Sequence, residues 1–247
     1  MSKSVLIAID NSAYAQNAVD FGIEIAKKIN AKLTGIGVVD IKGIQKLASG
    51  AAAGASYYAE KLEKEKLREA REKTRHLLDK FVKACQAKNV SYETVYAEGE
   101  PANEIMKVSE LSDFLLIGMK TFFRYGKEED AGNTFEKIVQ HAVCPIFGIT
   151  EDKEFPDMSV LVAYDGKTKA NRAIKAFANL NDVLKINTEV SVLTIDSDKT
   201  RGEEINKKAI QYLKTHNLET QAIVKKGKAK DVIFETAKEM DDGNNTL

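Results

Sequence analysis

The chain has 247 residues, of which 43% are hydrophobic and 30% charged, as in an ordinary globular protein. Basic and acidic residues are equal at 37 each, so charge gives no reason to expect a nucleic acid or an anionic membrane as partner. The start does not read as a signal peptide, and no stretch has the roughly 18 apolar residues that span a bilayer. The two cysteines, Cys85 and Cys144, match no metal-ligand spacing, so we expect a cytoplasmic protein with free thiols.

Short apolar runs alternate with helical patterns through the first part of the chain. Buried strands are predicted at 4–10, 32–39, 91–97, 113–118 and 145–149. Helices are predicted after a cap at Asn11 or Ser12, over 57–88, from Pro101, and over 133–141. The small, glycine-rich residues 40–56 are expected to form a mobile loop, and 119–132 a second loop. This alternation predicts a doubly wound α/β fold, with a parallel sheet and helices on both faces.

The predicted helix at 57–88 carries a one-sided apolar stripe, which a helix packed on a sheet requires. The stripe consists of Leu67, Ala70, Leu77, Leu78, Phe81 and Cys85. A coiled coil is the alternative, but the apolar heptads are not sustained. The stripe therefore favours a helix that covers one face of the sheet.

The pattern restarts after a polar linker at 151–158. SVLVAYD from residue 159 mirrors SVLIAID from residue 4, which places Asp165 opposite Asp10 at an offset of 155. Strands at 190–195 and 218–224 mirror the second and third strands, and Gly227 mirrors Gly99 at an offset of 128. We therefore expect domains at 1–150 and 159–247. The second is expected to be a truncated copy that ends where its fourth strand should begin, near Met240.

Four segments taken together resemble a domain of the universal stress protein family. They are SVLIAID with the helix that follows, GEPANEI, DFLLIG with its loop, and VCPIFGI. The resemblance covers nearly all of 1–150 and, more weakly, 159 to about 240, as in a tandem-domain member. It implies a five-stranded parallel sheet in the order 3-2-1-4-5, a homodimer or pairing of the two repeats, and, in one subset of the family, ATP binding.

The implied strand order places a ligand crevice between the first and fourth strands, where the order reverses. Asp10 ends the first strand and Gly118 the fourth. The family's ATP-binding members carry Gly, two residues, Gly, nine residues, Gly, and then Ser or Thr. Here Thr121 replaces the second glycine, and only an inserted residue brings Gly132 into register. The resemblance therefore implies a degenerate ATP-binding loop.

Each candidate residue of this crevice has two interpretations. Asp10 either contacts a ligand or caps the following helix. Phe122 and Phe123 either cover the crevice or an adenine, or anchor the loop to the core. The basic residues of the loop either bind phosphate or are solvated. The candidate nucleotide-binding residues are Asp10, Val39, Gly118, Lys120, Arg124, Gly126, Gly132, Asn133 and Thr134, with Asp165 and Ile195 as counterparts in the second copy.

The sequence carries no GxxxxGK[ST] loop, GxGxxG fingerprint or GxSxG elbow, and no nucleophile–base pair or metal site is predicted. We expect a universal stress response protein that is not an enzyme. It would sense a nucleotide, ATP or AMP with Mg²⁺, or bind an unknown protein partner. One alternative is a slow ATPase or adenylate-handling enzyme in which Asp10 holds Mg²⁺. Another is a scaffold that acts through the long helix and residues 40–56.

Overall fold

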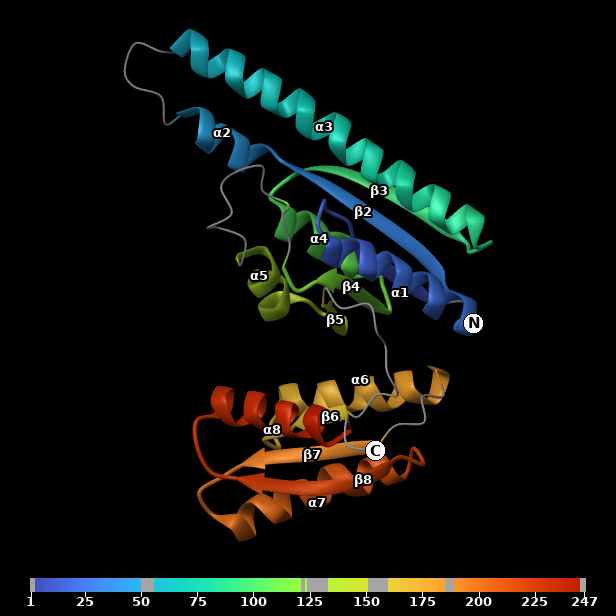
Figure 1. Ribbon diagram of the computed structural model, residues 1–247, viewed down its shortest axis with the longest axis vertical. Helices are drawn as coiled ribbons and strands as arrows, with labels where there is room; N and C mark the ends of the chain where they lie inside the picture. Colours follow the sequence, from blue (N-terminus) through green and yellow to red (C-terminus); the bar gives the residue numbers. More distant parts are fainter. Residues whose placement is uncertain are drawn as a thin grey trace. The chain divides into compact units, whose positions relative to one another are not determined.

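The computed structural model describes residues 3–49, 56–120, 123, 133–150, 160–184 and 189–244. The chain divides into two compact units, residues 1–153 and 154–247, and each unit forms its own parallel sheet (Figure 1). No helix within the described ranges is long and apolar enough to cross a membrane.

The first unit contains a five-stranded sheet in the order β3-β2-β1-β4-β5, with every neighbouring pair parallel. This confirms the predicted α/β class and the strand order implied by the resemblance. Its elements are β1 (Ser4–Ala8), α1 (Ala13–Ile29), β2 (Lys32–Asp40), α2 (Ile41–Ser49), α3 (Ser56–Ala87), β3 (Tyr92–Gly99), α4 (Pro101–Ser109), β4 (Phe114–Gly118), α5 (Asn133–His141) and β5 (Ile146–Ile149).

Helices cover both faces of this sheet. Alternate residues of a strand face opposite sides, and on β2 a side chain at Gly35 would meet Phe81 of α3, whereas Ile36 packs in a cluster with Ile105 of α4. Ile138 of α5 belongs to the same cluster. Gly22 of α1 lies against Ile7, which pairs with Gly35 in the sheet. Hence α1 and α3 cover one face, and α4 and α5 cover the other.

The prediction of a mobile loop at 40–56 is wrong for residues 41–49, which form α2; residues 50–55 lie outside the described part of the chain. The side chain of Asp40 explains the helix, because its Oδ1 accepts a hydrogen bond from the backbone N–H of Gly43 at 2.9 Å. This bond satisfies a donor of the first turn, as an N-cap does. Ile44 then packs with Val39 and Ala70, which fixes α2 against α3.

Two of the predicted strand boundaries also change. β1 ends at Ala8, so Asp10 lies in the turn that follows rather than at the end of the strand. β3 runs from Tyr92 to Gly99 and reaches the helix that begins at Pro101. By contrast, the predicted helix at 133–141 matches the bounds of α5, and β4 ends at Gly118 as expected.

The second unit contains a three-stranded parallel sheet in the order β6-β7-β8. Its elements are β6 (Val160–Ala163), α6 (Thr168–Leu184), β7 (Glu189–Ile195), α7 (Lys199–Lys214), β8 (Glu219–Lys225) and α8 (Ala229–Asn244). The three strands follow the order of β1, β2 and β3 in the first unit. Met240 lies within α8, so the position at which the repeat predicts the start of a fourth strand is helical.

Three asparagines mark junctions between a helix and the next strand. Asn30, Asn89 and Asn217 have φ of 52°, 54° and 57°, the left-handed conformation that ends helices. They follow α1, α3 and α7. Asn89 and Asn217 are separated by the same 128 residues as Gly99 and Gly227.

Candidate functional site

The candidate site lies at the carboxyl ends of β1 and β4. These strands are neighbours, with Leu6 opposite Leu115 and Ile7 opposite Leu116. The chain leaves β1 toward β2 on one side and returns to β4 on the other, so the strand order reverses between them. Open α/β sheets bind ligands at such a point.

Asp10 is 6% exposed and organises the turn after β1. Its Oδ1 accepts hydrogen bonds from the backbone N–H of Ser12 at 2.9 Å and from the Ser12 hydroxyl at 2.5 Å. The Ser12 Oγ in turn accepts from the N–H of Ala15 at 3.0 Å and is the N-cap of α1. Of the two predicted caps, Asn11 and Ser12, the structure therefore uses Ser12. Asp10 supports this cap because its carboxylate orients the Ser12 hydroxyl.

Gly118 is needed where α1 approaches the end of β4. A Cβ on Gly118 would lie 2.6 Å from the Cβ of Tyr14 and 3.4 Å from the N of Ala15. Close packing with α1 is therefore sufficient to account for this glycine. Lys120 lies at the same place, with its Nζ 5.8 Å from the ring centroid of Tyr14, a cation–π contact. Sequence reasoning missed Tyr14, because no motif identifies a helix residue that faces the end of a distant strand.

Val39 has no exposed surface and packs in the cluster formed with Ile44 and Ala70. This cluster lies on the face of the sheet that α2 and α3 cover. The Val39 side chain is therefore part of the core, while a contact between the Val39 backbone and a nucleotide stays a prediction.

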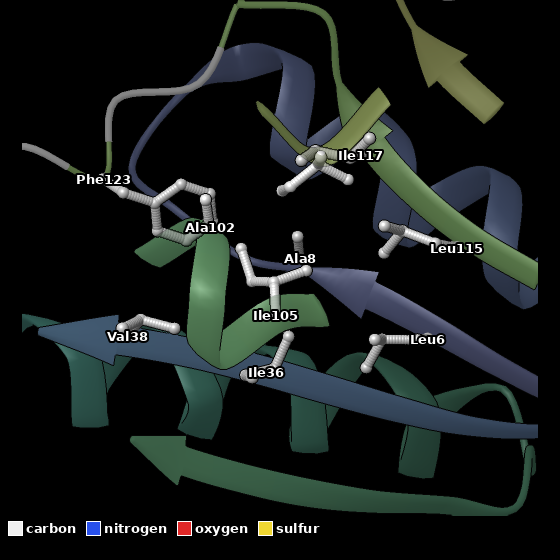
Figure 2. Packing of buried hydrophobic residues seen from close by; sticks show 10 residues of the cluster. Leu6, Ala8, Ile36, Val38, Ala102, Ile105, Leu115, Ile117 and Phe123 are labelled. Carbon is white, nitrogen blue, oxygen red and sulfur yellow. The ribbon is translucent and has the colours of Figure 1, made fainter. Parts of the chain in front are cut away.

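Phe123 fills the space beyond the carboxyl end of β1. The ring is 3% exposed and belongs to the cluster that contains Ala8, Val38, Ala102 and Ile138. Figure 2 shows it beside Ala102 at the start of α4, past Ala8 of β1. Of the two interpretations of the predicted Phe122–Phe123 pair, the structure favours an anchor in the core for Phe123; Phe122 lies outside the described residues.

The last two candidate residues of the first unit, Asn133 and Thr134, lie at the start of α5. Asn133 begins it, and Thr134 is 8% exposed. Residues four apart share one face of a helix, so Thr134 lies on the same face as Ile138. Arg124, Gly126 and Gly132, like Thr121, fall outside the described residues, so the predicted phosphate-contacting loop remains a prediction.

An ion pair that sequence reasoning missed joins α4 to α5 near the candidate site. The Lys137 Nζ donates to Glu100 Oε1 at 2.6 Å, and Asn103 donates to Glu100 Oε2 at 3.1 Å. Glu100 precedes Pro101 at the carboxyl edge of the sheet, so the pair holds the start of α4 beside α5. The contact spans 37 residues of chain, which no local pattern encodes.

A cavity of about 110 Å³ opens on the other face, between α1 and α3. Asp10, Ser12, Lys80 and Phe81 are among its lining residues. Pockets for drug-sized ligands are typically roughly 300–1,000 Å³. The cavity is therefore smaller than a typical ligand pocket.

The counterpart residues of the second unit form a different arrangement. Asp165 is exposed, and its Oδ1 accepts from the N–H of Lys167 at 2.9 Å, which repeats the turn seen at Asp10. Ile195 is half-buried at the end of β7. Beyond it, Arg201 donates from Nε and Nη2 to the two carboxylate oxygens of Asp196, both at 2.7 Å. These bonds, with one from the N–H of Asp198, lower the pKa of Asp196.

Neither a metal-binding cluster nor an activated thiol lies among the residues that the structure describes. Within the described ranges no cluster of three His, Cys, Asp or Glu side chains could hold a metal ion. Burial raises the pKa of the Cys85 thiol to about 11 and also raises that of Cys144, so neither thiol is activated as a nucleophile.

Comparison with known proteins finds universal stress proteins among the relatives of this chain. A universal stress protein of Methanocaldococcus jannaschii is 29% identical over 153 residues, which is 62% of this chain and 84% of the relative. The crystal structure of a universal stress protein from Archaeoglobus fulgidus covers 98% of this chain and 85% of its own, with 18% identity and a TM-score of 0.68, and so shares the fold.

A universal stress family protein from Arabidopsis thaliana has been solved with AMP bound. It is 21% identical and covers 62% of this chain and 96% of its own, with a TM-score of 0.40. At that score, the position of its AMP is not transferred to this chain. The family model for the universal stress protein family matches residues 1–147. Since that match covers more than half of the sequence, the chain belongs to the universal stress protein family.

Proposed function

We propose that this protein is a non-enzymatic stress-response module whose first unit senses an adenine nucleotide with low affinity and signals to a protein partner. The observation that supports this most directly is the state of Asp10. Its Oδ1 is engaged by the backbone and hydroxyl of Ser12, and so supports the cap of α1. A carboxylate used in this way is poorly placed to hold Mg²⁺ for phosphate transfer.

The proposed ligand follows from the location of the site and from the family. Ligands of doubly wound sheets bind where the strand order reverses, which is the edge formed by β1 and β4. Thr134 brings a buried hydroxyl close to the N-terminus of α5, where partial positive charge favours a phosphate. The family includes nucleotide-binding members, so an adenine nucleotide is the ligand to test first.

The low affinity follows from how the described residues are used. Gly118 packs against Tyr14, and the Lys120 ammonium group lies over the Tyr14 ring. Phe123 fills the apolar space at the same edge. The sequence also departs from the family's glycine spacing at Thr121. A ligand has to displace contacts that the chain already makes, which lowers its net binding free energy.

We further propose that the second unit is a domain of the same type, of which this sequence includes three strands. Its strands follow one another as β1, β2 and β3 do. Asp165 forms the same turn as Asp10, and Asn217 repeats the left-handed junction of Asn89. A homodimer or a pairing of the two repeats is a further prediction.

Calorimetric titration of ATP and AMP, with and without Mg²⁺, tests the proposed function. We expect no micromolar binding of ATP and no Mg²⁺-dependent hydrolysis, with any AMP binding in the high micromolar to millimolar range. Asp10→Asn is the matched variant, because it keeps an oxygen acceptor for Ser12 while removing the charge. Hydrolysis that requires Mg²⁺ and is lost in Asp10→Asn would favour the slow ATPase instead.

A further inference from the structure

Phe123 is placed differently from the other members of its hydrophobic cluster. Those neighbours belong to strands and helices: Ala8 to β1, Val38 to β2, Ala102 to α4 and Ile138 to α5. Phe123 belongs to neither a strand nor a helix, yet it is 3% exposed. A side chain from the β4–α5 connection therefore completes the core at the carboxyl edge of the sheet.

The side chains around the ring are small or aliphatic, so the space that the ring fills has the flat shape of an aromatic group. Ala8 and Ala102 are small, and they stand where β1 ends and α4 begins (Figure 2). Val38 and Ile138 supply apolar side chains. Thr134, a polar residue that is 8% exposed, lies one turn before Ile138 on the same face of α5. An apolar recess with one polar group is the kind of surrounding that binds a planar heteroaromatic ring.

We propose that Phe123 is an internal occupant of a ring-binding recess, and that the aromatic ring of a ligand competes with it for that place. The recess is the space bounded by Ala8, Val38, Ala102 and Ile138. Phe123 then sets the affinity of the site, because a ligand binds only the fraction of molecules in which the recess is open. The ligand class is a planar heteroaromatic compound; that it is an adenine compound rests on the proposed function.

The chain has no tryptophan, so one tryptophan introduced at this position is a clean reporter. Phe123→Trp also asks whether the recess accepts a two-ring system like adenine. We expect blue-shifted tryptophan emission from the free protein, because the ring is buried. Saturating adenine or AMP should shift the emission to the red and increase quenching by acrylamide, because the ring is displaced into water.

Emptying the recess gives the complementary measurement. Phe123→Ala should bind adenine at least about ten-fold more tightly than the unaltered protein, because the competing ring is gone. Phe147→Ala is the matched control. Phe147 also has an aromatic neighbour, Phe114, with 5.7 Å between the ring centroids. Ile146, the preceding residue of β5, packs against the Phe123 cluster. Because successive residues of a strand point to opposite faces, Phe147 faces the other side of the sheet. The Phe147→Ala variant should bind adenine no more tightly than the unaltered protein.

The outcomes separate this inference from the proposed function. A gain in adenine affinity without a gain for AMP supports the recess and contradicts nucleotide sensing. A folded Phe123→Ala protein that binds adenine no better than the unaltered protein overturns the inference. So does adenine binding, seen by calorimetry, that leaves the emission of Phe123→Trp unchanged. Circular dichroism checks folding, and if Phe123→Ala does not fold, the Phe123→Trp emission decides between the outcomes.

Discussion

Asp40 and Gly43 meet at the start of α2, where the Asp40 carboxylate accepts the Gly43 N–H at 2.9 Å and a methyl group on Gly43 would overlap Asp40 Oδ2. Asp40 is 4% exposed and has little room to move. The pair explains both why a helix begins directly after β2 and why its third residue is glycine.

Asp40→Ala should lower the free energy of unfolding by about 1 kcal/mol, the usual cost of a lost N-cap. Gly43→Ala should fail to give the gain of roughly 0.5–1 kcal/mol that alanine usually brings within a helix, because its methyl group would displace the capping carboxylate. Urea denaturation measures both. Lys42→Ala, an exposed change in the same turn, is the control. A stabilised Gly43→Ala protein would contradict this account of the cap.

Gly118→Ala should destabilise the first unit by about 1–3 kcal/mol, the usual cost of overpacking. Its new methyl group would lie 2.6 Å from the Cβ of Tyr14, on a helix that cannot easily move away. Gly148→Ala is the matched control. There the methyl would lie 2.9 Å from Cγ of Met119, a flexible side chain that is 48% exposed and can shift. Thermal unfolding should rank the two variants in this order, and equal losses would argue against the Tyr14 contact.

The stability of the first unit should depend on Glu98 at acid pH. Hydrogen bonds from Arg71, followed by that from the Tyr96 hydroxyl, hold the pKa of Glu98 below its ordinary value of 4.5. A carboxylate with a lowered pKa in the folded state stabilises the protein above the unfolded value, and this contribution is lost as pH falls through the folded value. The unfolding free energies of the unaltered protein and Glu98→Gln should therefore differ at pH 7 and converge as pH falls below 4.5 and through the lowered pKa of the folded state.

Glu72→Gln, on the exposed side of α3, is the control for this pH series and should leave the profile unchanged. A difference between the unaltered protein and Glu98→Gln that stays constant from pH 7 to pH 3 would mean that the ion pair with Arg71 does not form in solution.

Asn206 should be essential to the second unit. It has no exposed surface; its Nδ2 donates to the Ile223 carbonyl at 2.9 Å, and its Oδ1 accepts from the Thr194 hydroxyl at 2.5 Å. Asn206→Leu should cost about 1–3 kcal/mol, because the partly buried Ile223 carbonyl and the buried Thr194 hydroxyl each lose a hydrogen-bond partner.

A double-mutant cycle with Thr194→Val measures the coupling within this pair. The double variant should lose less stability than the two single losses added together, because each substitution already breaks the same bond. Simple additivity would show that the Thr194–Asn206 hydrogen bond contributes nothing.

Local patterns predicted most helices and strands of the chain well. The bounds of α5 follow from its helical pattern, and the start of α4 follows from Pro101, whose fixed φ suits a first helical position. The parallel sheet follows from apolar runs buried on both faces, such as β4 with its five buried residues. These features depend on residues that are close together in sequence.

The candidate site was less predictable because its contacts are long-range. The glycine-rich stretch after β2 suggested a loop. A capped helix was nevertheless indicated by Asp40, which can act as an N-cap, followed by the apolar residues Ile41 and Ile44 at helical spacing. The burial of Phe123 and the approach of Tyr14 to Gly118 depend on how the strands and helices pack together. No periodicity within either segment encodes them.

The two ends of the strands should differ in how well they tolerate insertions, and the left-handed asparagines mark the less tolerant end. Asn30, Asn89 and Asn217 each stand within three residues of the next strand. One residue inserted there would shift that strand and turn its buried side chains to the opposite face. At the other edge, α2 and the start of α3 follow β2 in the first unit, whereas β7 leads almost directly into α7. Insertions and deletions among relatives should therefore gather beside the carboxyl edge of the sheet, where new binding properties can arise without disturbing the strands.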